Sequence, residues 1–476
     1  MGLKHFTFSY KTQVEAAKKV VCMFARKAYD KLVEWKRVSN GKTAVMIEGA
    51  RRVGKSTVAE AFAKVEYRDY LMLDFSVESE AVKRNFAENI GDLDAFFRNL
   101  FLLKGKSLPR GESVVVFDEV QLFPLARQAI KQLVKDGRYH YIETGSLISI
   151  RENSGSILIP SEEYQIRMHP MDFEEFLWAK GDTVTADAIR EAFAAKKPLG
   201  TDIHRKIMGD FRMYMAVGGM PQAVAEYVAG GTFEEIDFAK RAILSLYDED
   251  IRKYDNAENG RVSAIYRSVP DQLGNRNMRF KYAAIDKNAR YDRLVSSLDF
   301  LSESMIVNVC TNVTAPDALM ELHVQKENFK MFMADTGLLV ARAMGTAAAL
   351  GESLYRALVF DKLDANLGMV MENMVAQMLV AQGHTLHFHE FECRPKASEP
   401  FKKESPKKYE VDFLLLRGKR VCPVEVKSSG YRAHKSLDRF LEKYDVKCNE
   451  CYVLYPKDLA REGRIVYLPL YMAMCL

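Results

Sequence analysis

One glycine-rich segment constrains the fold of this 476-residue chain more than any other feature. The pattern G-x-x-x-x-G-K-[ST] is met by Gly49, Gly54, Lys55 and Ser56. The apolar run at 44–47 predicts a buried strand before the pattern, and residues 56–65 after it have the apolar spacing of an amphipathic helix. Strand, glycine-rich turn and helix are the context that this pattern requires, so we favour a phosphate-binding loop over a chance match.

The residue types in this segment fit the binding of a nucleotide. Glycines let backbone N–H groups surround a phosphate, and the N-terminus of a helix adds a partial positive charge there. Lys55 would reach the β- and γ-phosphates, and the Ser56 hydroxyl would bind Mg²⁺. Arg51 and Arg52 are interpreted as solvent or partner contacts rather than arginine fingers. The nucleotide-binding residues predicted from the loop are Gly49, Arg52, Val53, Gly54, Lys55, Ser56 and Thr57.

A β-branched run at 113–117 predicts a second buried strand, which ends in the adjacent acids Asp118 and Glu119. Two acids at a strand end are common by themselves, but downstream of a phosphate-binding loop they indicate a Walker B pair. Asp118 would hold the Mg²⁺ shell through water, and Glu119 would polarise the water that attacks the phosphate.

A third strand is predicted at 139–143 and leads into Thr144. The Thr144 hydroxyl would sense the γ-phosphate or orient water, and a plain turn is the alternative. An arginine finger would complete the catalytic set. Its candidates are Arg151, Arg167 and Arg252, among which the sequence does not choose.

The chain resembles the AAA-type P-loop ATPases of bacteria and archaea that carry a C-terminal domain of unknown function. The motifs of the first part are EGARRVGKST, VVVFDEVQLFP, YIETGSL and MHPMDFEEFLWA. The later motifs are GGMPQAV (218–224), FMADTGLL (332–339) and YEVDFLL with PVEVKSS (409–429). The resemblance therefore spans nearly the whole chain. It implies an architecture more than a purpose, because roles within that family are largely unassigned.

Residues 179–255 carry apolar side chains at helical spacing among charged ones, which predicts a helical lid packed on the ATPase core. Helical segments at 260–273 and 291–304, followed by an apolar stretch at 305–310, resemble the winged-helix module that the family places here. Its basic residues would contact DNA phosphates, or form the solvated face of a module that only connects domains. They are Arg276, Arg279, Lys281, Lys287, Arg290 and Arg293.

The C-terminal part predicts an amphipathic helix at 368–383, with Glu372 near its start, and then three strands. Asp412 lies in the second of these strands and Glu425 in the third. Lys427 is two residues after Glu425, so both side chains share one face of the strand.

The order of these elements and acids matches the PD-(D/E)XK nuclease core. In that arrangement Asp412 and Glu425 would hold Mg²⁺ or Mn²⁺, with Glu372 as an outer or additional ligand. Lys427 would position the water or stabilise the charge that develops on phosphate. Val411 replaces the proline of the motif, and a retained set of this kind can also bind nucleic acid without cleaving it.

Composition excludes several classes of protein. With 48% hydrophobic and 28% charged residues, the chain is neither wholly disordered, collagen-like nor a coiled coil. The 69 basic and 64 acidic residues give a net charge of +5, which is concentrated partly at 276–293 and 394–408. No apolar run predicts a membrane-spanning helix, no signal peptide is recognised, and seven scattered cysteines favour a reducing cytoplasm.

Two further groups contain residue types that can bind zinc, but their spacing does not favour a zinc site. Cys448 and Cys451 have no second pair to complete a site. His387 and His389 would share a strand face that His384 does not, which is a poor start for tetrahedral ligation. We interpret both groups as structural.

These observations predict an α/β protein with four parts: an AAA-type P-loop core at 1–178, a helical lid at 179–255, a winged-helix-like module at 256–335 and a restriction-endonuclease-like domain at 336–476. We expect ATP and Mg²⁺ as cofactors and ATP hydrolysis coupled to a nucleic-acid-directed, nuclease-like C-terminal domain. The alternative is an ATP-gated protein-binding switch or regulator without nuclease activity. Candidate partners are DNA or another nucleic acid, a protein, and a second copy of the chain.

Overall fold

The computed structural model describes residues 24–146, 163–255, 260–275, 278–287, 290–344, 355, 358–359, 367–393, 406–430, 432–444 and 450–476. The chain divides into two compact units, Met1–His169 and Pro170–Leu476, and each is described by itself. The predicted lid, middle module and C-terminal domain thus fall together in the second unit. In the described part of the chain, no helix has the length and apolar character needed to cross a membrane.

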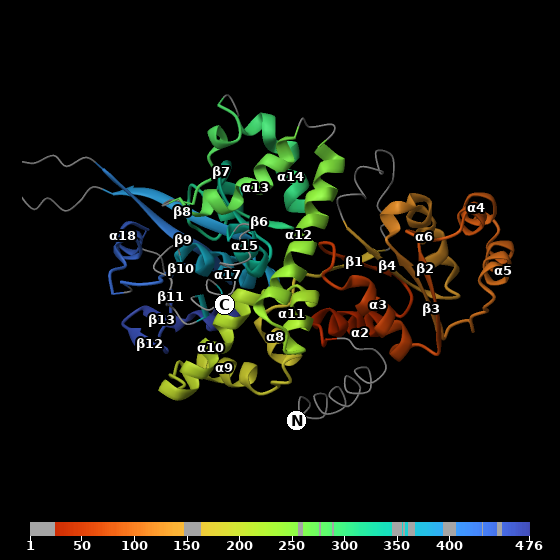
Figure 1. Cartoon of the computed structure of the whole chain (residues 1–476), viewed down its shortest axis with the longest axis horizontal. Coiled ribbons are helices and arrows are strands. Elements are labelled where there is room, and N and C mark those ends of the chain that lie inside the picture. The colour runs from red at the N-terminus through yellow and green to blue at the C-terminus, as the bar shows by residue number, and fades with distance from the viewer. Residues whose placement is uncertain are drawn as a thin grey trace, which may run out of the picture. The chain divides into compact units, whose positions relative to one another are not determined.

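A parallel five-stranded sheet with the order β2-β3-β4-β1-β5 forms the centre of the first unit (Figure 1). The strands are β1 (Ala44–Glu48), β2 (Asp69–Asp74), β3 (Ser113–Asp118), β4 (His140–Gly145) and β5 (Glu163–Arg167). β1 and β3 are buried along their whole length, as their uninterrupted apolar sequences predict. The three strands predicted in this unit are confirmed as β1, β3 and β4, which are neighbours in the sheet, so their carboxyl ends lie at one edge.

Helices of the first unit bury an aromatic core against this sheet. They are α2 (Lys27–Ser39), α3 (Lys55–Glu66), α4 (Glu80–Asn89), α5 (Leu93–Lys104), the 3₁₀ turn η1 (Val120–Leu122) and α6 (Pro124–Asp136). Phe86 of α4 meets the rings of Phe96 and Phe117 edge-on, at centroid distances of 4.8 and 5.7 Å. Edge-to-face packing of this kind adds to the burial of apolar area.

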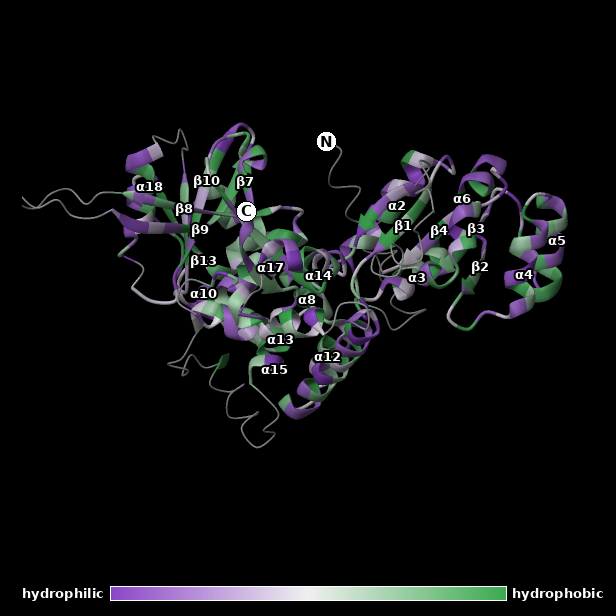
Figure 2. Cartoon of the chain, turned by 90° about the horizontal axis from the view of Figure 1, so that it is seen from above, coloured by the Kyte–Doolittle hydropathy of each residue, from purple (hydrophilic) through white to green (hydrophobic). Residues whose placement is uncertain are grey.

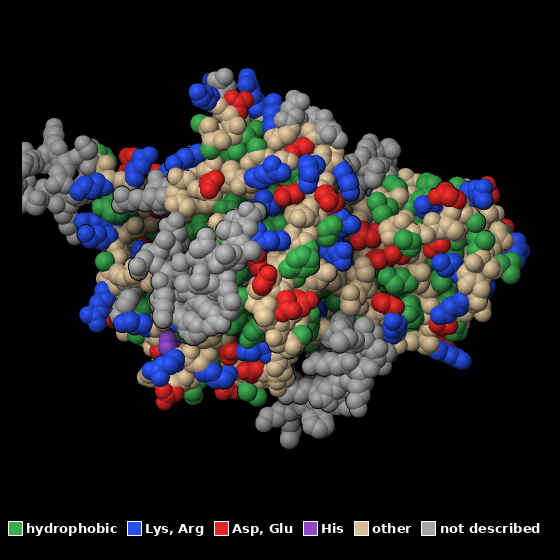
Figure 3. All heavy atoms as spheres, viewed as in Figure 1, with side chains coloured by type: hydrophobic (Ala, Val, Ile, Leu, Met, Phe, Trp, Pro, Cys, Tyr) green, Lys and Arg blue, Asp and Glu red, His purple; other side chains and the backbone are tan. Residues whose placement is uncertain are grey.

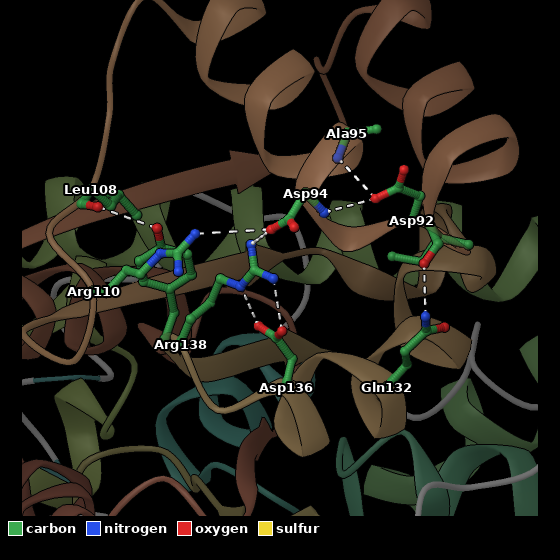
Figure 4. A network of polar contacts seen from close by, with 10 residues as sticks. Asp92, Asp94, Ala95, Leu108, Arg110, Gln132, Asp136 and Arg138 are labelled. Atoms are coloured by element: carbon green, nitrogen blue, oxygen red, sulfur yellow. Dashed lines mark hydrogen bonds and ion pairs between the residues drawn. The ribbon is translucent and has the colours of Figure 1, made fainter.

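A surface network joins the start of α5 to the end of α6 (Figure 4). The Arg138 guanidinium donates to Asp136 at 2.5 and 2.8 Å and to Asp94 at 2.9 Å. The Asp92 carboxylate accepts the backbone N–H groups of Asp94 and Ala95 and so caps α5. These contacts fix two helix ends and involve none of the residues predicted to bind nucleotide.

The second unit begins with helices, as predicted for 179–255. Its helices are α8 (Phe173–Ala179), α9 (Thr185–Ala195), α10 (Thr201–Val217), α11 (Pro221–Val228), α12 (Phe233–Asp255), α13 (Arg261–Leu273), the 3₁₀ turn η2 (Tyr282–Ala284), α14 (Tyr291–Glu303) and α15 (Thr336–Ala343). Figure 2 shows hydrophilic and hydrophobic residues mixed along α12, which is the colouring of a helix with one buried face.

Three of the family-like motifs meet at one junction in this unit. The Asp335 carboxylate accepts the Gly219 N–H at 2.6 Å. A Cβ at Gly219 would lie 2.0 Å from the Met171 carbonyl oxygen, and one at Gly218 would lie 2.9 Å from the Gly337 Cα. Glycine is required at these positions because backbone segments touch there. The motifs around 171, 218 and 335 are therefore packing determinants in this structure.

The second unit contains an eight-stranded mixed sheet with the order β12-β13-β11-β10-β9-β8-β6-β7. The strands are β6 (Val307–Val313), β7 (Val324–Met333), β8 (Leu386–Cys393), β9 (Lys407–Arg417), β10 (Arg420–Val426), β11 (Cys451–Tyr455), β12 (Ala460–Glu462) and β13 (Ile465–Pro469). The other elements are α17 (Leu367–Ala381), α18 (Lys435–Tyr444) and the 3₁₀ turns η3 (Met320–His323) and η4 (Leu470–Cys475).

After residue 366 the predicted helix and three strands are found as α17, β8, β9 and β10, and they are followed by α18 and β11. β9 is antiparallel to β10, and β10 is parallel to β11. One feature differs from the expected organisation. β6 and β7 pair with each other and β6 pairs with β8, so the strands of the middle module extend the C-terminal sheet. The predicted boundary near 335 thus runs through one packed unit.

Candidate functional site

The phosphate-binding loop lies between β1 and α3, as predicted, and its shape depends on two glycines. The segment after β5 pairs with the end of β1 through the Met168 N–H, which donates to the Glu48 carbonyl at 2.7 Å. A Cβ at Gly49 would lie 2.3 Å from the Met168 carbonyl oxygen, so a side chain cannot be accommodated there without backbone movement. Gly54 has φ +98°, in the left-handed region that favours glycine.

The amine of Lys55 lies inside this loop. Lys55 is 5% exposed, and its Nζ donates to the carbonyl oxygens of Gly49 at 2.9 Å and Ala50 at 3.1 Å. Burial lowers the pKa of Lys55, while the nearby carboxylates of Glu119 and Asp118 oppose that shift. The acids predicted to act with the loop are therefore close enough to influence its lysine.

Two predicted hydroxyl residues from two different elements converge on one carboxylate oxygen of the predicted Asp118. Ser56 Oγ, at the start of α3, donates to Asp118 Oδ1 at 2.6 Å. The Thr144 hydroxyl, on β4, donates to the same oxygen. A serine hydroxyl next to an aspartate carboxylate is the oxygen donor pair that Mg²⁺ uses in phosphate-binding loops, so these residues fit the ion. Thr144 is thus placed at the site.

Glu119 follows Asp118 in an unusual backbone conformation. Its φ is +52°, and its N–H donates to Thr144 Oγ1 at 3.4 Å. The Gln121 side-chain amide donates to the Glu119 carboxylate. Gln121 is 5% exposed and was not singled out from the sequence, although it lies in the motif VVVFDEVQLFP. Its contact orients the predicted water-activating group.

Arg26 is another residue that sequence reasoning missed. It is 4% exposed and precedes α2; it donates to the Val53 carbonyl of the loop at 2.6 Å and to the His169 carbonyl at 2.7 Å. The guanidinium thereby ties the loop to the segment after β5. No motif surrounds Arg26 in the sequence, so only the tertiary contact reveals this role.

The remaining loop and arginine predictions are placed as follows. Arg51, Arg52 and Thr57 are exposed, and Arg52 has φ +69°. Among the finger candidates, Arg167 is exposed on β5 and Arg252 lies on α12 of the second unit. The residues and ranges of other predictions that lie outside the described part of the chain are Arg151, Arg276, Cys448 and 394–405.

The acids predicted in the C-terminal domain also come together. Phe413 of β9 pairs with Val424 of β10, which places Asp412 and Glu425 one position further along the two strands. Asp412 Oδ2 accepts the Val426 N–H at 2.8 Å, and Lys427 Nζ lies 2.6 Å from Glu425 Oε1. The predicted lysine therefore pairs with the predicted acid.

The pKa values of two of these carboxyls are strongly raised. Burial raises the pKa of Glu425 to about 7, the Asp412 charge adds to the shift, and Lys427 opposes it. Burial raises the pKa of Glu372, on α17, to about 8; Lys330 opposes the shift, and Asp412 adds to it. Asp412 therefore influences both acids, as expected for a shared cluster.

Lys330 is the residue of this cluster that the sequence did not reveal. It lies on β7, is 1% exposed, and its Nζ is 2.7 Å from Glu410 Oε1 and 3.5 Å from Glu372 Oε2. A lysine among Phe329, Met331 and other apolar residues of a strand was the available sequence signal. It could not be tied to Glu372 without the tertiary structure, because β7 was assigned to another module.

The histidines near residue 387 make protein contacts. His387 lies between the Thr311 hydroxyl at 2.9 Å and the Glu321 carboxylate at 3.0 Å. His389 contacts the Tyr444 hydroxyl at 2.8 Å. Among the described residues, no group of three or more His, Cys, Asp or Glu is arranged to hold a metal ion. The carboxylates around Asp412 are included in that result.

Of the basic residues that the sequence predicted to contact DNA, all but one of those described are exposed. Arg279 is the exception, because its guanidinium is paired with Glu390 at 2.6 Å and Glu410 at 3.3 Å. It is thus used in packing against the sheet. The exposed ones are Lys281, Lys287, Arg290 and Arg293.

Comparison with protein families supports the ATPase prediction. Residues 41–177 match the family described as an AAA domain. That match supports an AAA-type ATPase. Residues 208–348 and 367–472 match two domains of unknown function, DUF8612 and DUF4143 respectively. The chain has no match among curated proteins.

Similar solved structures share little sequence with the chain. The Pif1 helicase from Candida albicans is 13% identical, with 39% of this chain and 47% of that chain covered and a TM-score of 0.21. A STAND protein with a tetratricopeptide repeat sensor from Pyrococcus horikoshii is 13% identical, with 76% and 48% covered and a TM-score of 0.25. Cdc6p from Pyrobaculum aerophilum is 14% identical, with 71% and 94% covered and a TM-score of 0.24. The chain spans about half the length of the first two, and these TM-scores carry no conclusion about its function.

Proposed function

We propose that the first unit binds and hydrolyses ATP with Mg²⁺, and that this cycle controls a nucleic-acid-directed second unit. The observation that carries the ATPase part is the convergence of Ser56 and Thr144 on Asp118 beside the buried amine of Lys55. In this proposal Lys55 neutralises the β- and γ-phosphates, while Glu119, held by Gln121, orients the attacking water. Mg²⁺ held near Ser56 and Asp118 would neutralise charge that develops on the transferred phosphate.

Three variants test the ATPase part. Lys55→Ala is expected to weaken ATP binding because the phosphates lose their buried cation. Asp118→Asn is expected to weaken Mg²⁺ binding, so that hydrolysis requires a higher Mg²⁺ concentration. Glu119→Gln should still bind ATP, whereas phosphate release falls by about 10²–10⁴-fold, the range for loss of a general base. Titration with a fluorescent ATP analogue measures ATP binding, and phosphate-release assays over a range of Mg²⁺ concentrations measure hydrolysis and its Mg²⁺ requirement.

Lys64→Ala provides a matched control for the lysine variant. Lys64 is on the same helix, α3, and pairs with Glu60 at 2.6 Å on the surface. Its removal should leave both ATP binding and hydrolysis near the values of the unsubstituted protein, since exposed pairs contribute little. Hydrolysis that persists in Lys55→Ala would contradict the proposal.

The nucleic-acid part is supported by the order of elements from α17 to β11, the carboxylates around Asp412, and the exposed basic residues near Lys287 and Arg290. On the face of the second unit seen in Figure 3, Lys and Arg side chains are interspersed with Asp and Glu. Such a surface would contact a small number of phosphates, so the salt dependence of binding should be modest.

The measurement is fluorescence anisotropy of labelled DNA and RNA duplexes over a range of salt concentrations. Lys287→Glu with Arg290→Glu is expected to weaken binding and to reduce the salt slope by about 0.9 for each duplex DNA phosphate contact that is lost. Arg84→Glu with Lys131→Glu makes the same change of net charge on exposed residues of the first unit. Equal effects of the two double variants would indicate a general charge effect and contradict a local binding surface.

The second candidate is an ATP-gated switch that binds its partner without cleavage. The contact of Lys330 with Glu372 and Glu410 favours it, because those carboxylates already have a cationic partner. Partner capture that responds to ATP and is insensitive to salt would favour a protein partner. A cytoplasmic location and self-association of the chain remain predictions from the sequence.

A further inference from the structure

We infer that Lys330 is an internal cation of the acid cluster formed by Glu372, Glu410, Asp412 and Glu425, and that it keeps a divalent metal ion out of that cluster. The inference changes the role predicted for these carboxylates. Their charge would be neutralised by the chain itself. While Lys330 is in place, the C-terminal domain would bind nucleic acid without cleaving it by a metal-dependent reaction.

The position of Lys330 provides the first argument. Its ammonium lies 2.7 Å from Glu410 Oε1 and 3.5 Å from Glu372 Oε2. The side chain is almost fully buried, with its Nζ 5.3 Å from the centre of the Phe388 ring. A buried charge persists only where it is paired, so the carboxylates and this ammonium depend on one another.

Several carboxylate oxygens of the cluster are also engaged by other groups of the protein, whereas Glu425 Oε2 is buried without a hydrogen-bond partner and Glu372 Oε2 has only the ion pair with Lys330. Both oxygens of Glu410 have partners: Oε1 pairs with Lys330 and Oε2 with Arg279. Asp412 Oδ2 accepts the Val426 N–H. Glu425 Oε1 pairs with Lys427. A divalent ion would have to compete with these donors for its ligands.

Electrostatics provides the second argument. A divalent cation coordinated by Glu372 would lie within a few ångströms of the Lys330 ammonium. The two like charges would repel in an environment that solvent screens weakly. The positive charge of Lys330 thus cancels much of the attraction that the carboxylates would otherwise exert on a metal ion. This agrees with the arrangement of the described acids, which is not that of a metal site.

The fold explains why this lysine is available. β7 lies at the edge of the sheet, and Lys330 pairs there with Cys310 of β6. Arg279 forms an isolated bridge with Lys330 and holds Glu410 and Glu390. The middle module therefore supplies both cations, Arg279 and Lys330, to carboxylates of the C-terminal domain.

Titration with Mn²⁺ tests the inference, with free Mn²⁺ followed by electron paramagnetic resonance. The parent for these measurements is the Asp118→Asn protein, so that the proposed metal position of the ATPase site does not contribute. All further substitutions are made in this parent, and no nucleotide is added. Lys330→Met removes the ammonium and keeps an apolar side chain of similar length. It should gain one Mn²⁺ site that the parent lacks, with an affinity about tenfold or more above any residual binding by the parent, because the repulsion is lost. Adding Asp412→Asn should abolish the gain.

Lys240→Met is the matched control. Lys240 is also fully buried in the second unit, and its Nζ donates to the Ala216 carbonyl at 2.8 Å and the Tyr355 hydroxyl at 2.7 Å. Its substitution should not increase Mn²⁺ affinity. No gain for folded Lys330→Met, as judged by circular dichroism, would overturn the inference.

The parent protein keeps the inference testable even if Lys330→Met does not fold. The parent should show no Mn²⁺ binding that Asp412→Asn removes, and such binding would overturn the inference. Only the statement about binding without cleavage rests on the proposed nucleic-acid function. The metal measurement needs neither ATP nor nucleic acid, so the two proposals can fail separately.

Discussion

Single residues decide the shape of the phosphate-binding loop, and Gly49 shows this most directly. A Cβ there would lie 2.3 Å from the Met168 carbonyl oxygen, which is backbone and cannot rotate away. We expect Gly49→Ala to destabilise the protein by about 1–3 kcal/mol, as overpacking does, and to weaken ATP binding because the loop must shift. Thermal unfolding and titration with a fluorescent ATP analogue measure these effects. Gly91→Ala is the control, since its Cβ would meet nothing within 4 Å. Similar losses in both variants would contradict this explanation.

At the scale of elements, the start of α9 depends on a carboxylate outside the helix. Asp182 accepts N–H groups from Val184 and Thr185 at 3.1 and 3.0 Å and the Thr185 hydroxyl at 2.6 Å. Burial would raise its pKa, but these hydrogen bonds and Lys206 outweigh burial and lower the pKa to about 2. The folded pKa lies below the reference value of 3.8, so the stabilisation is present above about pH 4 and is lost as the pH falls toward 2. Asp182→Ala should lower the free energy of unfolding by about 1 kcal/mol at neutral pH, with a smaller difference near pH 2. Urea unfolding at several pH values measures this, and a loss of the same size for the exposed Asp187→Ala would contradict it.

At the scale of the whole chain, sheet topology defines the larger of the two units. β6 and β7 precede α17 by many residues, yet they continue the sheet that contains β8 to β13. The sequence assigned them to a winged-helix-like module because local helices and an apolar stretch resembled one. Pairing between distant strands has no local signature of comparable strength, since register and partner are fixed by burial of one face against the rest of the unit. This pairing brings Lys330 to Glu372 and Glu410.

The sequence by itself determined the features that depend on short spacings. It located the loop from Gly49 to Ser56, the strand that ends at Asp118, and the strand that leads to Thr144, because backbone conformation and phosphate chemistry restrict residue types within a few positions. It also predicted the helix and three strands that the structure shows as α17, β8, β9 and β10. Only the tertiary structure decided that Arg26, Gln121 and Lys330 belong to these sites. Their roles come from contacts with residues that are distant in the chain or from a precise backbone turn, and such contacts form only when apolar packing brings the elements together.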